Sequence, residues 1–528
     1  HEVTGSCHFL QAAGLNILVD CGMEQGNDVY ENQELPIAAS DVDCILLTHA
    51  HIDHSGLIPL MYVNGFRGQV YSTSATAQLC EIMLRDSAHI QMFEAEWRNR
   101  KAARSGGKLK EFVPLYDMDA AVNVCKQFVG CEYDRVYDIA EGIKIRFTDV
   151  GHLLGSASIE VWATEKTENG DVTEKIVFSG DIGNINKPII KDPKHVRDAD
   201  YVVMESTYGN RSHGGTPNYV EDLTDIFKRT FERGGNVVIP SFAVGRTQEL
   251  LYIIRKIKED NLVGRDFDVY MDSPLAIEAT NIFIKNVESC FDDEAVELVR
   301  KGINPLSFPG LKYATTGDES KQINFDPNPK VIISSSGMCE AGRIRHHLKH
   351  NLWRPECTIV FVGYQAVGTT GRIIVDGAEE IKLFGEPIQI KAEIVQLKGS
   401  SGHADKDGLL CWINAFDTKP KKVFVVHGED SVCDEFTECL KEEYGYDAMA
   451  PYTGGSYDLI ADRVISEGVK ERKTRRTTST QRGKTVFDRL VAAGKRLMTV
   501  ITHNEGGTNK DLAKFTDQIN ALCDKWDR

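Results

Sequence analysis

The stretch Thr48-His-Ala-His-Ile-Asp-His54 contains three imidazoles and one carboxylate within six residues. It follows the apolar run Cys44–Leu47, which predicts a buried strand that ends at the motif. Imidazole nitrogen and carboxylate oxygen are ligands that zinc uses in proteins. Alternate residues of an extended loop project in related directions, and the final His turns to the opposite side, so the spacing fits two neighbouring metal ions better than one. The four candidate ligands are His49, His51, Asp53 and His54.

Three more residues with metal-binding side chains each come just after a predicted strand: His152, Asp181 and His427. One such residue alone is more often a cap or a satisfied polar group. Together with the motif, they supply the ligands that two zinc ions need, including a carboxylate able to bridge the ions. Asp20 ends the predicted strand Asn16–Asp20, and we expect it to orient a ligand His from behind.

Length, composition and charge limit the classes of function. The chain has 528 residues, enough for several domains, and its 41% hydrophobic and 26% charged residues are ordinary globular values. The net charge of −17 excludes binding of nucleic acid over the whole surface, because phosphate binding requires basic residues. Any contact with RNA or DNA must therefore occur in a local cleft. Scattered Cys residues without a CxxC pair, no apolar run that could span a membrane and no signal peptide predict a cytoplasmic protein with reduced thiols.

The middle of the chain differs in pattern from its two flanks. Short apolar strands predominate in the first 200 residues, whereas strands and helices alternate from about 215 to 380, which predicts a parallel sheet covered by helices. The expected helices there are Asn218–Arg233, Thr247–Lys258 and Glu340–His350, and the expected strands are Asn236–Pro240, Phe267–Met271 and Lys330–Ser334. The first pattern then returns with strands expected at Pro387–Val395 and Lys422–Val426.

The C-terminal part has a third composition. Residues 466–485 contain seven Lys or Arg against two acidic residues and predict a flexible basic linker. Two amphipathic patterns follow, Val486–Leu497 and Leu512–Trp526, and predict a helical hairpin over 486–528. Packing or homodimer formation is the ordinary role of such a hairpin, and nucleic-acid docking through the basic linker is the alternative.

The order of Asp20, the motif at 49–54, His152, Asp181 and His427 resembles the metallo-β-lactamase superfamily over nearly the whole chain up to about residue 460. The resemblance implies an α/β protein with a four-layer αββα sandwich and two metal ions at one edge. It also implies how the ligands are shared: His49, His51 and His152 hold one ion, Asp53, His54 and His427 hold the other, and Asp181 bridges them.

The separation of 246 residues between Asp181 and His427 leaves room for an inserted domain. With Glu205 in Glu-Ser-Thr-Tyr-Gly and His403 in Ser-Ser-Gly-His-Ala-Asp, the sequence resembles the β-CASP subfamily, whose members cleave nucleic acids. His at 427, where DNA-processing members typically carry Val, favours the RNA-processing branch that includes the cleavage and polyadenylation endonuclease subunit. The implied domains are 1–207 and 386–465 for the metallo-β-lactamase domain, 208–385 for the β-CASP domain, 466–485 for the linker and 486–528 for the hairpin.

The resemblance implies a zinc-dependent ribonuclease that cuts single-stranded RNA internally with water activated by two metal ions. Asp181 and Asp53 then bind the metal ions and help to activate the attacking water. His403, held by Glu205, gives a proton to the leaving oxygen. Two alternatives stay open: a silent RNA-binding scaffold and a small-molecule hydrolase of the same superfamily.

Several residues after predicted strands are candidate contacts for the phosphate backbone or bases of RNA. Ser334-Ser-Ser-Gly337 precedes a helix expected at residue 340, so its backbone N–H groups could face an anion, and Arg246 begins another helix. By contrast, His346, His347 and His350 are expected on a solvated helix face. The candidate substrate contacts are Arg246, Ser335, Ser336, Gly337 and Tyr208.

Overall fold

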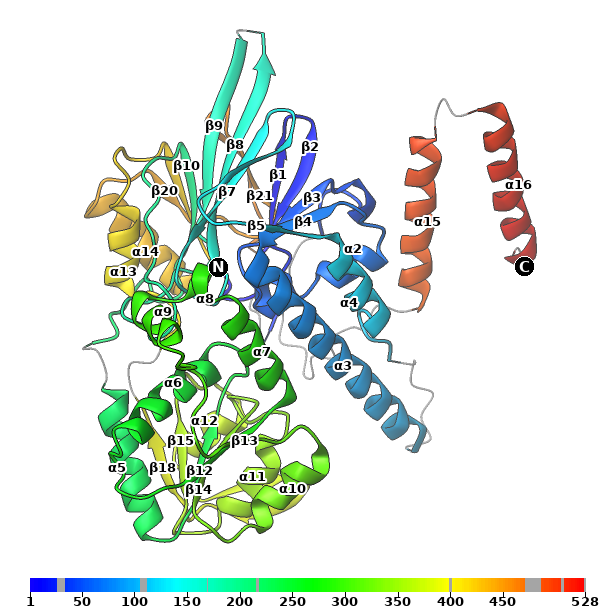
Figure 1. Ribbon diagram of the computed structural model, residues 1–528. Coiled ribbons are helices and arrows are strands. Elements are labelled where there is room, and N and C mark those ends of the chain that lie inside the picture. Colours follow the sequence, from blue (N-terminus) through cyan, green and yellow to red (C-terminus); the bar gives the residue numbers. More distant parts are fainter. Residues whose placement is uncertain are drawn as a thin grey trace.

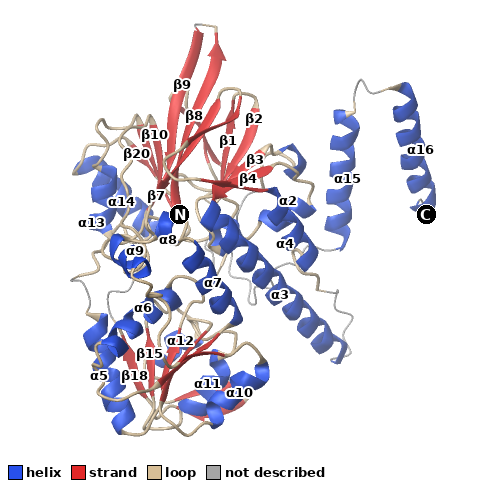
Figure 2. Ribbon diagram, viewed as in Figure 1, coloured by secondary structure: helices blue, strands red, loops and turns tan. Residues whose placement is uncertain are grey.

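Two sheets of short strands pack face to face in the computed structural model, which describes residues 1–25, 34–104, 112–168, 170–214, 218–397, 401–470, 486–504 and 508–526. The first sheet contains, in order, β1 (His8–Ala12), β2 (Leu15–Val19), β3 (Cys44–Leu46), β4 (Gln69–Thr73) and β5 (Phe128–Cys131). The second contains, in order, β20 (Ala448–Met449), β19 (Lys422–Val426), β10 (Tyr201–Glu205), β9 (Gly170–Phe178), β8 (Ala157–Thr167), β7 (Ile143–Asp149) and β6 (Val136–Ala140). Helices cover the outer faces (Figures 1 and 2).

Alternation along the strands assigns each side chain to a layer. In β2, Ile17 and Val19 belong to the hydrophobic core between the sheets, whereas Leu18 packs under the helices of the first sheet. In β10, Tyr201 faces the core between the sheets and Val202 faces the helices of the second sheet. This arrangement confirms the four-layer αββα sandwich. The covering helices are α2 (Ile58–Val63), α3 (Ser74–Arg104) and α4 (Met118–Val124) on the first sheet, and α13 (Lys406–Ile413) and α14 (Asp430–Glu442) on the second.

Between β10 and α13, the chain forms the predicted second domain around a parallel six-stranded sheet. In order, this sheet contains β13 (Leu311–Tyr313), β12 (Asp268–Asp272), β14 (Lys330–Ser334), β11 (Val237–Pro240), β15 (Thr358–Phe361) and β18 (Glu393–Gln396). Its helices are α5 (Tyr219–Glu232), α6 (Arg246–Glu259), α7 (Pro274–Lys285), α8 (Val287–Cys290), α9 (Asp293–Arg300), α10 (Gly317–Phe325), α11 (Ile344–Asn351) and α12 (Thr370–Val375).

The segment after the boundary expected at residue 386 contributes a strand to the parallel sheet. The single strand expected at Pro387–Val395 is two strands: β17 (Glu386–Gln389), which forms a hairpin with β16 (Glu380–Leu383), and β18. Because β18 pairs with β15 in the parallel sheet, this segment belongs to the inserted domain. A strand pattern alone does not show which sheet a strand joins.

The inserted domain is packed against the sandwich rather than tethered to it. Helix α3 of the sandwich packs against α7 of the inserted domain, and residues from both helices belong to one hydrophobic cluster. Leu153 of the sandwich and Val244 of the inserted domain belong to the same cluster. The two domains therefore share a continuous hydrophobic core, and their relative position is defined by packing.

The C-terminal part begins with a hairpin of β21 (Gly455–Asp458) and β22 (Arg463–Glu467), so the first two residues of the expected linker are in a strand. Residues 471–485 of that linker lie outside the described part of the chain. Two helices follow, α15 (Val486–His503) and α16 (Asn509–Trp526), each longer than expected, and Figure 1 shows them beside the sandwich. In the described residues, no helix is both long and apolar enough to cross a membrane.

Candidate metal centre

The motif at 49–54 follows the carboxyl end of β3. Its first part is extended, but residues Ile52–Ser55 form the short helix α1. Asp53 and His54 therefore lie in a helical turn, not on the extended loop that the spacing predicted. A Cβ atom at Gly22 would lie 1.6 Å from the carbonyl oxygen of Asp53, so only glycine allows the segment after β2 to pack against this helix.

The first group of candidate ligands brings together three loops of the sandwich. His49 Nε2 and His152 Nε2 lie 3.4 Å and 3.5 Å from Asp181 Oδ2. His51 Nδ1 lies 3.1 Å from His49 Nε2 and 3.2 Å from His152 Nε2. The four residues can each direct one ligand atom to a common point, with all these atoms within 4.8 Å of one another.

The second group lies on the other side of the same carboxylate. Asp53, His54 and His427 also place ligand atoms within 4.8 Å of one another. Asp181 Oδ1 lies 3.1 Å from His54 Nε2 and 3.4 Å from His427 Nε2. Since its other oxygen faces the first group, Asp181 lies between the two sets of ligands, as a bridging carboxylate must.

Asp20 fixes which nitrogen of two ligands is protonated. His54 Nδ1 donates to Asp20 Oδ2 at 2.7 Å, and the Thr48 hydroxyl donates to the same oxygen at 3.0 Å. The Thr48 oxygen can then accept a hydrogen bond from His49 Nδ1, 3.1 Å away. In both imidazoles, Nδ1 is thus occupied and Nε2 faces Asp181, the orientation that metal coordination requires.

The arrangement of the ligand atoms suits coordination of a metal ion better than hydrogen bonding among these side chains. His152 Nδ1 donates to the carbonyl oxygen of Gly402 at 3.2 Å, so its Nε2 also faces the site unprotonated. Among the described residues, His54 Nε2 and Asp181 Oδ1 are buried atoms without a hydrogen-bond partner. Burial, together with the neighbouring imidazoles, lowers the pKa of His51 to about 3, so this ring is neutral at pH 7. Buried imidazoles around a carboxylate are a suitable cation site.

His403 and Glu205 adjoin this centre. The His403 Nδ1 atom lies 3.1 Å from Glu205 Oε2, and its Nε2 lies 3.8 Å from Asp181 Oδ2. The backbone of His403 pairs with Gly183, and the N–H of Ile182 donates to Glu205 Oε1 at 2.5 Å. The His403 side chain remains 21% exposed, so it is both held in place and accessible to a ligand.

The expected anion site at Ser334-Ser-Ser-Gly337 differs in the structure. Helix α11 begins at Ile344, not at residue 340, and the intervening residues form a turn. The N–H of Ser336 donates to Ala341 within that turn at 3.3 Å, and the Ser335 hydroxyl donates to Ser273 at 3.0 Å. The backbone of this turn is thus not presented at a helix N-terminus, and the reason given for phosphate binding there was wrong.

The other candidate substrate contacts have partners within the protein. Arg246 NH1 lies 2.5 Å from Glu249 Oε2 on the same helix. The Tyr208 ring lies 6.1 Å from the ring of His403, between centroids, and the guanidinium of Arg211 lies 4.6 Å from its centroid. Tyr208 therefore lies beside His403.

His347 is not on a solvated helix face. Its side chain is fully buried, with Nε2 2.6 Å from Asp272 Oδ2 and Nδ1 2.9 Å from Asn324 Oδ1. Asp272 also accepts hydrogen bonds from Ser320 at 2.6 Å and from Arg343 at 2.7 Å. The basic residues around His347 in the sequence suggested an exposed helix face. The apolar spacing of α11 was the feature that indicated a buried side of this helix.

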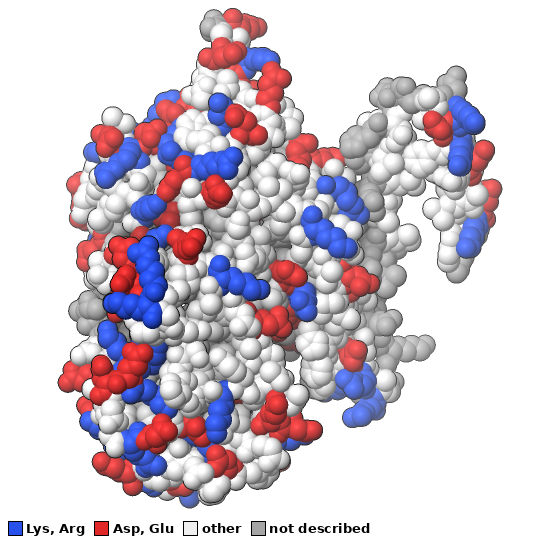
Figure 3. Space-filling model, in the orientation of Figure 1, with Lys and Arg blue, Asp and Glu red and all other residues white. Residues whose placement is uncertain are grey.

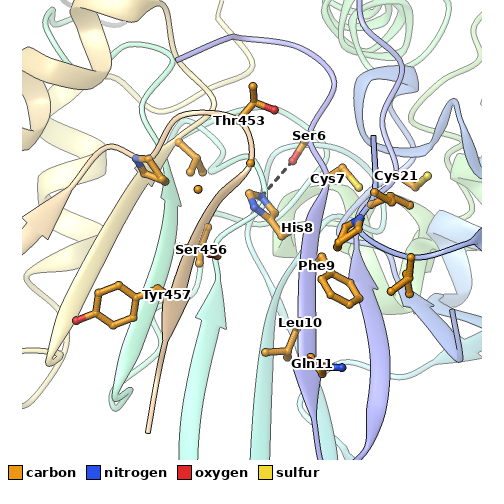
Figure 4. Close-up of a pocket in the computed structure, with 18 of the residues that line it drawn as sticks. Ser6, Cys7, His8, Phe9, Leu10, Gln11, Cys21, Thr453, Ser456 and Tyr457 are labelled. Atoms are coloured by element: carbon orange, nitrogen blue, oxygen red, sulfur yellow. Dashed lines mark hydrogen bonds between the residues drawn. The ribbon is translucent and has the colours of Figure 1, made fainter. Parts of the chain in front are cut away.

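A separate large cavity, of about 1910 Å³, lies between β1 and the β21–β22 hairpin (Figure 4). His8 and Tyr457 are among its lining residues, and His427 is the only candidate metal ligand that lines it. Burial lowers the pKa of His8 to about 4, so this ring is neutral. The cavity is therefore not where the ligands converge.

Three family models match consecutive parts of the chain. The metallo-beta-lactamase superfamily domain matches residues 9–184, the Beta-Casp domain matches 247–374, and the Zn-dependent metallo-hydrolase RNA specificity domain matches 387–451. Ribonuclease TTHA0252 of Thermus thermophilus is 35% identical over 430 residues, which are 81% of this chain and 91% of that protein. The transcription termination factor FttA of Methanosarcina mazei is 32% identical over 465 residues, which are 85% of this chain and 69% of that factor.

The chain belongs to the β-CASP branch of the metallo-β-lactamase superfamily. The family resemblance drawn from the motifs is thereby confirmed, and metal dependence follows from the family. Figure 3 shows acidic and basic side chains interspersed over one face of this β-CASP protein, without a broad basic area. This agrees with the net charge of −17, which excludes binding of nucleic acid over the whole surface.

Proposed function

We propose that this β-CASP protein is a ribonuclease that cuts single-stranded RNA internally and uses two zinc ions. The observation that carries the proposal is the position of Asp181, which faces two groups of ligands through different oxygens and adjoins His403. The RNA specificity domain and the relative named as a ribonuclease support RNA as the substrate of this hydrolase.

The proposed ligand sets are those that the family resemblance implied. When bound, a pair of divalent cations supplies an activated water and offsets the negative charge of the phosphate. Asp53 and Asp181 direct carboxylate oxygens to the two groups, and Asp181 is also placed to accept a proton from the attacking water. Asp20 keeps the His54 ring in the tautomer and orientation that this requires. The two sets are His49, His51 and His152, and Asp53, His54 and His427, with Asp181 shared.

His403 is the proposed general acid. Because Glu205 accepts from His403 Nδ1, the protonated Nε2 faces the centre, where it can donate to the leaving oxygen of the cleaved phosphodiester. Burial alone would lower the pKa of His403, but the carboxylates of Glu205 and Asp181 outweigh burial and raise the pKa to about 9. The ring is therefore protonated at neutral pH, as an acid must be.

The proposal also includes substrate contacts and an assembly state. Tyr208 is placed to stack on a base beside His403, and Arg246 is the proposed phosphate contact of the inserted domain. Ser335, Ser336 and Gly337 remain proposed contacts, but not as N–H groups at a helix N-terminus. A homodimer through α15 and α16 and a cytoplasmic location also remain proposals.

A silent scaffold and a small-molecule hydrolase are less well supported. Every proposed ligand position holds a metal-binding side chain, which a silent scaffold does not need. The inserted domain, together with Glu205 and His403 beside the centre, argues against a small-molecule hydrolase. The termination factor FttA shares the architecture, but the match covers 69% of that factor, so its role in transcription is not carried over.

The test is cleavage of an end-labelled single-stranded RNA. We expect internal products, their loss when a chelator removes the metal and their recovery when zinc is restored. A double-stranded RNA of the same sequence is the matched control and should be cut more slowly. Products that are single nucleotides released from one end, or cleavage that persists in chelator, would contradict the proposal.

A further inference from the structure

One ion pair connects the inserted domain to a ligand loop of the sandwich. Lys187 follows Asp181 in the sequence, and its Nζ donates to the carbonyl oxygen of His152 at 2.9 Å. The same Nζ lies 3.4 Å from Glu249 Oε1, on α6 of the inserted domain. The other oxygen of Glu249 faces Arg246, so one carboxylate joins two cations from different domains.

This ion pair is buried. The side chains of Lys187 and Glu249 are 11% and 10% exposed. Burial raises the pKa of Glu249, but the charges of Arg246 and Lys187 outweigh burial and hold that pKa below its ordinary value. Glu249 keeps Arg246 when Lys187 is removed, but Lys187 loses its carboxylate partner when Glu249 is removed, so the position of Lys187 depends on Glu249.

The pair acts on a loop that has little freedom. His152 is already held by the hydrogen bond of its ring to Gly402 and by the hydroxyl of Ser156, which accepts from its N–H at 3.0 Å. A Cβ atom at Gly183 would lie 2.0 Å from the carbonyl oxygen of Gly151, so the loop after Asp181 is pressed against the loop that carries His152. Lys187 supplies the remaining backbone contact of His152, from this pressed loop.

We propose that Lys187 and Glu249 form an interdomain clamp in which Lys187 is a positioning residue for His152. The inserted domain then supports the metal centre itself, besides its part in substrate binding. This inference rests on the proposed role of His152 as a metal ligand. It implies that a substitution in the inserted domain, at a residue that touches no ligand side chain, weakens metal binding.

The experiment measures zinc affinity by competition with a chromogenic chelator, without RNA. Partners behind a ligand typically change metal affinity 10- to 100-fold, so Glu249→Gln and Lys187→Met should each weaken zinc binding about 10-fold. The double variant should lose little more than either single variant, because both remove the same contact. Lys187→Arg keeps the charge and the donors and should restore most of the affinity.

The matched control is Glu393→Gln, which removes ion pairs with Arg229 and Arg233 inside the inserted domain and should leave zinc affinity within twofold of wild type. Zinc affinity unchanged in both clamp variants, or lost equally in the control, would overturn the clamp. If Glu249→Gln does not fold, as judged by circular dichroism, Lys187→Met in the other domain carries the test. Wild type that binds zinc but cuts no RNA would overturn the proposed function and leave the clamp standing, whereas wild type that binds no zinc would overturn both.

Discussion

At the scale of single residues, His403 combines a fixed orientation with access to ligand. Removing a positioned general acid typically lowers the rate 10²- to 10⁴-fold. We therefore expect His403→Ala to lower kcat for RNA by about that factor while zinc content stays at the wild-type level. Product formation from end-labelled RNA and metal analysis of the purified variant measure the two quantities. Equal cutting by both proteins would remove His403 from the mechanism.

The pair of His403 and Glu205 also predicts a pH dependence. The pKa of His403 is raised to about 9, so the acid is present below that pH and is lost as the pH rises through it. We expect the rate to fall on the alkaline side with a midpoint near 9. In Glu205→Gln the midpoint should move to lower pH, because the carboxylate that raises the pKa is gone. A midpoint that is the same in both proteins would assign the alkaline loss to another group.

Asp149 is a buried carboxyl whose effect is on stability. Burial raises its pKa to about 7, against an ordinary value of 3.8. Between these two values the folded chain binds more protons than the unfolded chain, so this group makes the protein less stable as the pH rises from about 4 to about 7. Asn can still accept the N–H of Gly151, which lies 3.0 Å from Asp149 Oδ1, and carries no charge.

Asp149→Asn should therefore be more stable than wild type at pH 8, with a smaller difference at pH 5. Urea unfolding of both proteins at the two pH values, at one zinc concentration, measures the difference. A stability difference that does not change with pH would show that this carboxyl titrates normally in the folded chain.

At the scale of elements, the inserted domain depends on the buried contact between α11 and the end of β12. His347 and Asp272 are both fully buried and lie 2.6 Å apart. Removing a hydrogen bond to a buried charged group costs about 1.5–3 kcal/mol. We expect His347→Ala to lower the free energy of unfolding by about 3 kcal/mol. His350→Ala on the exposed side of the same helix should change it by no more than about 0.5 kcal/mol.

Chemical denaturation followed by circular dichroism measures this difference. Equal stabilities for the two variants would mean that the His347 contact contributes nothing net. The expectation of a solvated face failed for His347, although His346 and His350 are exposed, because a helical pattern rich in basic residues shows that a face is polar, not that every residue on it is exposed.

At the scale of the whole molecule, α15 and α16 expose apolar side chains that the sandwich does not cover. Leu490, Met498, Leu522 and Trp526 are each more than half exposed. Exposed apolar patches typically mark an interaction surface. Deleting residues 471–528 should therefore change the oligomeric state without abolishing cleavage, since no proposed ligand lies in that part. Light scattering coupled to size-exclusion chromatography measures the number of chains per particle, and the RNA assay measures cleavage. The same number of chains per particle in both proteins would contradict the proposed homodimer.

The positions of several strands and the kind of site could be predicted from the residues alone, whereas the four layers of the sandwich followed from the family resemblance. Strands of alternating or continuous apolar residues need only local periodicity to be recognised, and β14 and β19 begin and end where the pattern placed them. The ligands were recognisable because so many metal-binding side chains at the ends of strands are rarely needed for structure alone.

Long-range pairing was not accessible in this way. That β18 joins the inserted sheet, that Asp53 and His54 lie in a helical turn, and that His347 is buried each depend on partners far along the chain. The contact of Lys187 with Glu249 is of the same kind, because neither residue stands out in its own segment. Local sequence sets which side chains are available and how each short element is shaped, but close packing between distant segments selects the partners of every buried charge.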